Sequence, residues 1–149
     1  MTDPQEIASQ ALMVGVAGEI FALDARQVRE ILDPAPMTRV PGAKPYVAHV
    51  VNVRGKVVPL ADLNVRFGTP PAVFSGDSRF VVLEVDIDED PTTVAIVADK
   101  VFEVAEIDPA TLQKTPQIGM RWRPEFIAGI AKWKGEFIVL PNMAKILSE

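Results

Sequence analysis

The chain has no cysteine among its 149 residues and only one histidine, His49. The absence of cysteine excludes disulfide bonds, thiolate nucleophiles and every cysteine-ligated zinc or iron–sulfur site. His49 has no serine in a nucleophile elbow beside it, so a catalytic triad would have to be assembled from scattered residues. We interpret His49 as a buried or interfacial side chain. An unrecognised hydrolase stays open as an alternative, and His49→Ala would then abolish its turnover.

Positive charge is also scarce. Lys and Arg number 15 against 20 Asp and Glu, which gives a net charge of −5 at pH 7. A protein that binds nucleic acid usually meets the phosphates with an excess of Lys and Arg on one face. No phosphate-binding loop is present, because Gly15 and Gly18 fall in a hairpin and Gly55-Lys56 lacks the earlier glycine. We expect protein or small-molecule partners and no cofactor.

Long hydrophobic runs are missing as well. No stretch approaches the ~18 uninterrupted apolar residues of a membrane-spanning helix. The first ten residues, MTDPQEIASQ, lack the basic start and apolar centre of a signal peptide. A content of 48% hydrophobic and 23% charged residues is typical of a soluble globular chain. We expect a cytoplasmic protein, with residues 1–149 forming a single domain and no direct membrane insertion.

What the sequence does contain is mainly a set of valine-rich runs with the alternation of β-strands. The segment 67–78 is rich in Gly and Pro and is predicted to be a loop, and it is the best candidate for an internal boundary. The acidic segment 88–91 is predicted to be the exposed end of a hairpin. The fold class is therefore mainly β. Expected strands cover residues 11–16, 19–23, 47–53, 56–61, 79–87, 92–107 and two runs after residue 125.

Two short helices are expected beside these strands. One covers residues 24–32, where Asp24 and Gln27 have the spacing of a capping box and apolar residues recur at i, i+3 and i+4 from Val28. The other closes the chain at about residues 142–147.

An ungapped repeat relates the residues that follow His49 to those that follow Gly129. Each copy reads as a strand, a basic-Gly turn, a second strand, a polar cap and a short apolar helix. Two such halves are best explained by two small β-barrels side by side, since closing a sheet removes its exposed edges. The space between the barrels would form a groove. The aligned pairs are Val50/Ile130, Val53/Trp133, Arg54/Lys134, Gly55/Gly135, Val58/Ile138, Leu60/Leu140, Asp62/Asn142 and Leu63/Met143.

A calcium-binding loop is suggested by Asp86-x-Asp88-x-Asp90, but the pattern fails. Its sixth position is Pro91, where a glycine is needed for the turn, and its twelfth is Val97, where a bidentate Glu should stand. We expect a solvated hairpin without metal.

Two basic–aromatic triplets, Arg121-Trp122-Arg123 and Lys132-Trp133-Lys134, leave a second alternative open. A small β-barrel could stack single-stranded nucleic acid on such rings. Trp133, however, occupies the Val53 position of the repeat and is expected inside a barrel, while Trp122 is interpreted as an interface anchor. Binding of an oligonucleotide at low salt would identify a nucleic-acid-binding protein.

The segment NVRGKVVPLADL places an Asn, an Arg and a Gly in an otherwise apolar run. On physical grounds alone, Gly55 supplies a positive φ to a tight turn and Arg54 points to water. The segment also resembles the most recognisable motif of the bacterial chemotaxis coupling proteins, the CheW-like family. The residues that match the family pattern are Asn52, Arg54, Gly55, Pro59, Asp62 and Leu63.

Other landmarks of that family follow in the same order and cover nearly the whole chain. They are FALDARQVREIL, TRVPGAKPYV, VAIVADKVFEV and IAGIAKWKGEFIVL. The resemblance implies two five-stranded β-barrels with a groove between them and no enzymatic activity, catalytic residue or cofactor. It also implies a scaffold that joins the cytoplasmic tips of methyl-accepting chemoreceptors to the regulatory domain of a CheA-type histidine kinase. The protein would then associate with membrane receptor arrays through these partners.

The resemblance further implies two sets of contact residues. The receptor-facing set would lie in and beside the groove, where apolar residues give affinity for a helical hairpin and charges fix its register. The kinase-facing set would lie at an edge of the first barrel and in a loop of the second. The receptor-facing residues are Val28, Glu30, Arg54, Ala95, Val101 and Val104, and the kinase-facing residues are Met37, Ala48, His49, Lys114, Gln117 and Ile118.

The chain departs from the family pattern at His49, where the family usually has glycine, and at Ala48, which replaces a charged or polar residue. A partner that approaches this backbone must therefore accommodate an imidazole.

Overall fold

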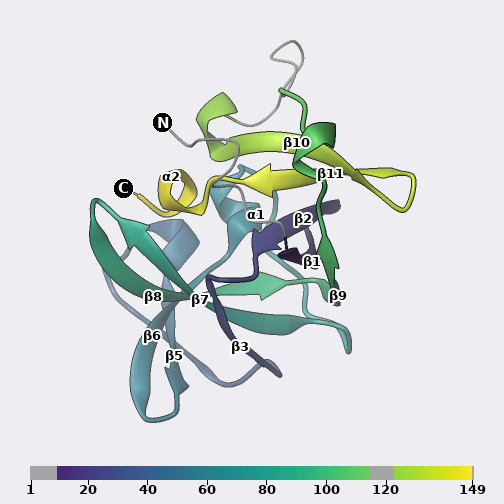
Figure 1. The fold of residues 1–149 in the computed structure, drawn as a ribbon. Helices are drawn as coiled ribbons and strands as arrows, with labels where there is room; N and C mark the ends of the chain where they lie inside the picture. Colours follow the sequence, from purple (N-terminus) through teal and green to yellow (C-terminus); the bar gives the residue numbers. More distant parts are fainter. Residues whose placement is uncertain (1–9, 115–122, 149) are drawn as a thin grey trace.

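The computed structural model describes residues 10–114 and 123–148, which form two β-sheets with short helices at their ends (Figure 1). The five-stranded sheet has the order β10-β11-β2-β1-β9, and the six-stranded sheet has the order β3-β7-β8-β6-β5-β4. The strands are β1 (Gln10–Val16), β2 (Glu19–Asp24), β3 (Val28–Leu32), β4 (Met37–Arg39), β5 (His49–Val53), β6 (Lys56–Ala61), β7 (Arg79–Ile87), β8 (Asp90–Ala98), β9 (Lys100–Glu106), β10 (Ile127–Trp133) and β11 (Glu136–Pro141). The helices are α1 (Leu63–Arg66) and α2 (Met143–Leu147), with single 3-10 turns η2 (Pro45–Val47), η3 (Pro109–Thr111) and η4 (Pro124–Phe126).

Each sheet takes strands from both halves of the chain. The hairpin β1–β2 pairs with strands of the second half, and the hairpin β7–β8 lies between β3 and β6 of the first half. The mainly β fold with two sheets is confirmed. The sheets are open rather than closed barrels, however, and they contain five and six strands. The loop at residues 67–78 joins α1 to β7, which belongs to the same sheet as β6, so it does not separate the two sheets.

The repeat found in the sequence is visible in the hydrogen bonds. β6 pairs in parallel with β8, and β11 pairs in parallel with β2. At the start of the two helices, the backbone N–H of Asp62 donates to Tyr46 O and that of Asn142 donates to Phe126 O, each at 2.8 Å. Both cap side chains also accept a backbone N–H of their own helix. The two halves are therefore equivalent units, related by an offset of 80 residues along these segments (142 − 62 and 126 − 46).

Arg66 joins the two units where they meet. Its guanidinium carbon lies 4.7 Å from the centroid of the Tyr46 ring and 4.8 Å from that of the Phe126 ring. Its Nε donates to the carbonyl oxygen of Ile146 at 2.8 Å. The side chain thus connects α1 to α2 and to both 3-10 turns that precede the repeated hairpins.

Three clusters of buried apolar side chains fill the fold. The largest lies between the two sheets, because its members come from β1 and β2 of one sheet and from β7 and β8 of the other. A second cluster is made by strands of the six-stranded sheet alone, and the third by the five-stranded sheet and the residue that follows β9. Since the central cluster spans both sheets, burial holds the two units together as one body.

The prediction of a helix at residues 24–32 is wrong, because the chain forms a tight turn there, followed by strand β3. Asp24 accepts the backbone N–H of Arg26 through its side chain and that of Gln27 through its carbonyl, each at 2.9 Å. A register shift between Val28 and Glu30 in the pairing with β7 then inserts one extra residue. Such a bulge places two apolar residues three apart on one face of a strand, which imitates the spacing of a helix.

The run expected as a strand at residues 92–107 is two strands, β8 and β9, which break at Asp99 and belong to different sheets. Two further expectations about the elements are confirmed. The turn between β7 and β8 lies at Asp88 and Glu89, whose φ angles are 52° and 65°, and α2 follows a cap at Asn142. Val53 is buried in the six-stranded sheet, and its counterpart Trp133 is half-buried against the cluster of the five-stranded sheet.

Candidate functional site

The turn that carries Arg54 is built to hold this side chain in one place. Arg54 and Gly55 have φ angles of 52° and 82°, and both therefore occupy the left-handed region. The side-chain Oδ1 of Asn52 accepts the backbone N–H of Gly55 at 2.8 Å, which ties the turn to the end of β5. A left-handed backbone is easy for glycine but unfavourable for a long side chain such as Arg. An arginine at this position therefore has a conformational cost that the turn itself does not require.

The guanidinium of Arg54 reaches across the six-stranded sheet to Glu30 on β3. Its Nε lies 3.1 Å and 3.0 Å from the two carboxylate oxygens, and its Nη2 donates to Oε1 at 2.9 Å. The hydrogen bonds from Arg54 lower the pKa of Glu30, and Glu30 in turn raises the pKa of Arg54. The side chain of Arg54 is 80% exposed, whereas that of Glu30 is 23% exposed. Glu30 thus fixes the orientation of a guanidinium that faces solvent.

Two apolar residues of β3, Val28 and Ile31, point to the opposite face of this edge strand from Glu30, which stands opposite Val82. Val28 stands opposite Leu83 and Ile31 stands opposite Val81 on β7. Both partners belong to the cluster between the sheets. Residues that stand opposite each other in a ladder share a face of the sheet. Val28 and Ile31 therefore continue the surface of the central core outward, and Ile31 is 44% exposed.

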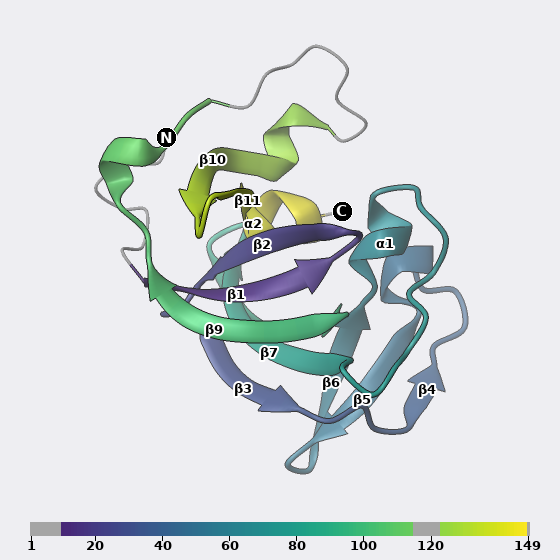
Figure 2. The same ribbon diagram turned by 90° about the vertical axis from the view of Figure 1, so that its right-hand side faces the viewer.

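The strand β9 repeats this arrangement at the edge of the other sheet. Val101 stands opposite Val14 and Val104 opposite Leu12, with a register shift between these two pairs as in β3. Both partners again belong to the central cluster. Figure 2 looks onto the two edge strands, with β7 drawn between β9 and β3. Val104 is 57% exposed.

These residues together form the candidate site, which we call the docking face. It combines apolar residues of two edge strands with the guanidinium that Glu30 binds, and it has the mixed character of a protein-binding surface. Ile31 belongs to this face but was not expected from the sequence. The signal that could have found it is the match between Val-x-Glu-Ile in β3 and Val-x-Glu-Val in β9. The docking face is Val28, Glu30, Ile31, Arg54, Val101 and Val104.

Ala95, which was expected to face the receptor, lies elsewhere. It is 0% exposed and belongs to the cluster of the six-stranded sheet, beside Val53 and Leu60. A partner cannot touch it unless the sheet opens, so its contribution is to the packing beneath the surface.

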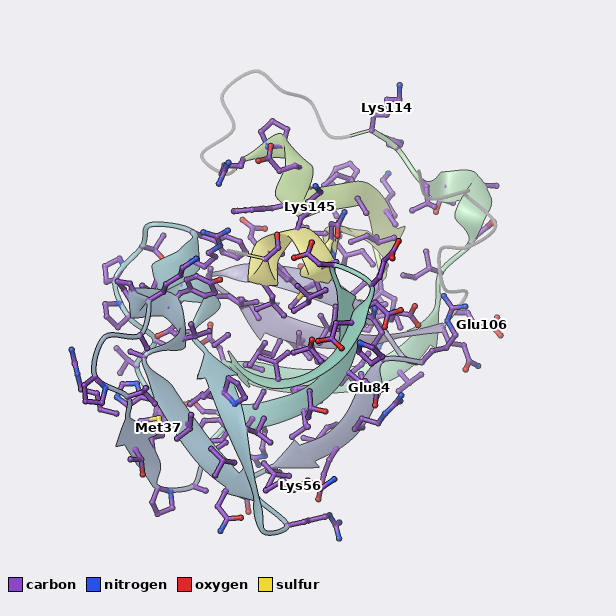
Figure 3. The ribbon with its side chains drawn as sticks, turned by 90° about the vertical axis from the view of Figure 1, so that its left-hand side faces the viewer. Met37, Lys56, Glu84, Glu106, Lys114 and Lys145 are labelled. Atoms are coloured by element: carbon purple, nitrogen blue, oxygen red, sulfur yellow. The ribbon has the colours of Figure 1, made fainter. Side chains whose placement is uncertain are left out.

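The residues expected to face the kinase fall into two separate places. Met37, on the edge strand β4, is 41% exposed and stands opposite Val51, while Ala48 and His49 are half-buried at the start of β5. Lys114 is exposed after β9, and Figure 3 shows it at the opposite end of the molecule from Met37. Gln117 and Ile118 lie outside the described residues, as does Trp122.

Three further observations concern metal binding, membrane crossing and surface hollows. Within residues 10–114 and 123–148, no group of three His, Asp or Glu side chains could hold a metal ion. No helix in this part of the chain has the length and apolarity needed to cross a bilayer. A surface hollow of about 550 Å³ is lined by residues of β1, β2, β7 and β11 and by the start of α2, and Asp24, Arg26 and Asp86 are among its lining residues. Asp24 and Arg26 already bind each other there at 2.8 Å.

Comparisons with known proteins agree with this geometry. Residues 10–149 match the CheW-like domain. A probable chemotaxis protein CheW from Rhizobium etli is 28% identical over 134 residues, which cover 90% of this chain and 84% of that protein. A chemotaxis protein CheW from Klebsiella aerogenes is 24% identical over 144 residues, covering 97% and 84% of the two chains.

A solved structure has the same fold. The scaffolding protein TtCheW from Thermoanaerobacter tengcongensis superposes with a TM-score of 0.82 at 26% identity, over 95% of this chain and 89% of that one. The match to the family extends over almost all of the chain and includes both the NVRG turn and the two edge strands. The chain therefore belongs to the CheW-like family of chemotaxis adaptor proteins.

Proposed function

We propose that this chain is a non-catalytic adaptor that couples the cytoplasmic tips of chemoreceptors to the regulatory domain of a CheA-type histidine kinase. The observation that carries the proposal is the docking face, where Glu30 holds an exposed guanidinium of Arg54 beside two apolar edge strands. Because the turn alone would favour Gly or Asn at position 54, an arginine there is best explained by a function. Association with membrane arrays would follow from binding to the receptors.

The receptor tip would dock on this face as a helical hairpin. Its apolar side chains would bury Val28, Ile31, Val101 and Val104, and this burial would supply most of the affinity. A carboxylate or carbonyl group of the receptor would accept the free N–H groups of Arg54, since Glu30 engages only Nε and Nη2. The charged pair would then fix the register of the hairpin on the face.

The kinase would bind away from the docking face. The exposed edge strand β4 with Met37, and the adjoining Ala48 and His49, would form one contact at the margin of the six-stranded sheet. Lys114 would belong to another contact, at the far end of the molecule (Figure 3). Because these two places point away from each other, one adaptor could contact two kinase domains.

A reconstitution tests the proposal. A soluble cytoplasmic fragment of a methyl-accepting chemoreceptor is immobilised, and the kinase regulatory domain is passed over it with and without this chain. We expect the kinase domain to be retained only when the chain is present. Arg54→Asn should abolish retention by weakening the receptor contact, whereas Met37→Glu should weaken the kinase contact only. Equal retention without the chain, or none with it, would refute the coupling role.

A further inference from the structure

The two halves of the fold present the same acid–base arrangement twice. Lys134 has the position of Arg54 in the repeat, precedes a glycine in the same way and has a φ of 51° against 52°. Its Nζ lies 3.1 Å from a carboxylate oxygen of Glu103 on β9, as Arg54 reaches Glu30 on β3. In both sheets, an acidic residue of the edge strand is thus joined to the basic turn of the hairpin across the sheet.

The two arrangements differ in the side chains around them. Next to Glu30, Arg29 lies 3.3 Å from Glu84 in another ion pair. At the corresponding place on β9, Phe102 packs edge-on against Trp133, with 6.1 Å between the ring centroids. Phe102 remains 41% exposed. The second arrangement is therefore aromatic where the first is charged, and we call Phe102, Glu103, Trp133 and Lys134 the aromatic corner.

Two ammonium groups lie over the rings of this corner. Lys134 Nζ is 5.0 Å from the centroid of Trp133, and Lys100 Nζ is 5.3 Å from that of Phe102. Among the ion pairs of the described residues, none involves Lys100. An ammonium above a half-exposed ring can donate to a carboxylate of a partner while the ring contacts an apolar side chain.

We propose that the aromatic corner is a second contact for the same helical partner, and that it binds an aliphatic side chain next to a carboxylate on the partner's other arm. The inference rests on the proposed docking of a receptor hairpin. A hairpin of antiparallel helices offers two arms, and the docking face offers two edge strands of the same pattern, Val28/Ile31 and Val101/Val104. Phe102 receives the aliphatic side chain, and Lys100 and Lys134 hold the carboxylate.

The differences between the Arg54–Glu30 pair and the aromatic corner fix the orientation of the hairpin in the complex. Arg54 offers a planar fork that suits bidentate contacts, whereas Lys134 offers a compact charge beside two rings. A helix of the hairpin that fits the Arg54–Glu30 pair therefore leaves polar or apolar groups unmatched at the aromatic corner, and the reverse also holds. The hairpin consequently docks in one orientation only.

The test uses matched variants of the full chain and the same soluble chemoreceptor fragment, with binding measured by titration calorimetry. Phe102→Ser and Lys134→Ala should each lower the affinity by roughly fivefold or more, and Lys134→Ala should also weaken its salt dependence. The controls are Phe137→Ser and Lys132→Ala. Phe137 is 60% exposed with Lys132 Nζ 5.3 Å above its ring, but both project from the opposite face of the hairpin to Trp133. The controls should leave the affinity unchanged.

The outcomes separate this inference from the proposed function. If Arg54→Asn weakens binding but Phe102→Ser and Lys134→Ala do not, the aromatic corner is no contact and the proposed function stands. Equal losses in the corner variants and the controls would also overturn the inference, because the effect would not depend on position. If the unaltered chain does not bind the fragment, both proposals fail. Melting temperatures of all variants show whether any loss comes from unfolding.

Discussion

Replacing Arg54 with asparagine removes the guanidinium while keeping the left-handed backbone conformation of the turn, so it tests binding separately from folding. Asparagine accepts the left-handed backbone that Arg54 adopts at a φ of 52°, so the turn should form at least as well as before. The exposed pair with Glu30 is screened by water and contributes little to folding. We therefore expect the melting temperature to stay within about 2 °C of the unaltered protein or to rise.

Binding should respond differently. In the complex the guanidinium would be shielded from water, and its hydrogen bonds to a receptor carboxylate or carbonyl would no longer be exchanged for bonds to solvent. Loss of a charge-assisted hydrogen bond of this kind lowers affinity by roughly ten- to a hundredfold. Arg54→Lys should recover only part of the affinity, because an ammonium cannot reproduce the planar fork.

Titration calorimetry with the soluble chemoreceptor fragment measures the loss, and differential scanning calorimetry measures the stability. Asp88→Asn is the matched control, since Asp88 has the same φ of 52° in the turn between β7 and β8, away from the docking face. It should leave receptor affinity unchanged. Two results would contradict this prediction: an affinity of Arg54→Asn within error of the unaltered chain, or a fall in melting temperature of more than about 5 °C. Either would show that Arg54 stabilises the turn and does not contact a partner.

Three further substitutions test other parts of the structure. Burial, with a smaller effect from the charge of Asp62, raises the pKa of Asp99 above its ordinary value of 3.8. Its protonated form therefore stabilises the fold at low pH, and this contribution is lost as pH rises through the raised pKa. Asp99→Asn should thus raise the melting temperature at about pH 7 and lose that advantage near pH 3; an equal gain at both would contradict this. Arg66→Met should lower the free energy of unfolding in urea by about 1–3 kcal/mol, because Ile146 O loses its donor; an unchanged value would show that Arg66 does not join the two units. His49→Gly should change affinity for the kinase regulatory domain but not for the receptor fragment, and the reverse result would remove His49 from the kinase contact.

Local features of the fold could be predicted from the sequence because they depend on neighbouring residues. The hairpin turns at Ala17-Gly18 and Arg54-Gly55 follow from glycine and from the alternation on either side. The repeat also held in three dimensions, since Asp62 and Asn142 cap equivalent helices. The exception was residues 24–32, where a bulge in β3 gave apolar residues a helical spacing. A bulge depends on the partner strand, and a single sequence does not reveal that partner.

Long-range features were out of reach for the same reason. The pairing of β2 with β11 and of β8 with β6 joins segments from different halves of the chain. The sequence of a strand does not indicate which distant strand it will pair with. The burial of Ala95 follows from this pairing, because β8 lies between β7 and β6 in the interior of its sheet. The partner of Arg54 was equally hidden, although both members of the pair were expected at the site.

The hairpin β1–β2 pairs with later strands, and the hairpin β7–β8 pairs with earlier ones. This arrangement determines when each sheet can form during synthesis. During synthesis the six-stranded sheet lacks the two strands that connect β3 to β6 until Ala98 has left the ribosome. The five-stranded sheet lacks β11, the partner of β2, until Pro141 has followed. A nascent chain that stops before these points leaves unpaired strand edges exposed to aggregation. The two halves therefore cannot mature one after the other, and both sheets are complete only when β11 is available.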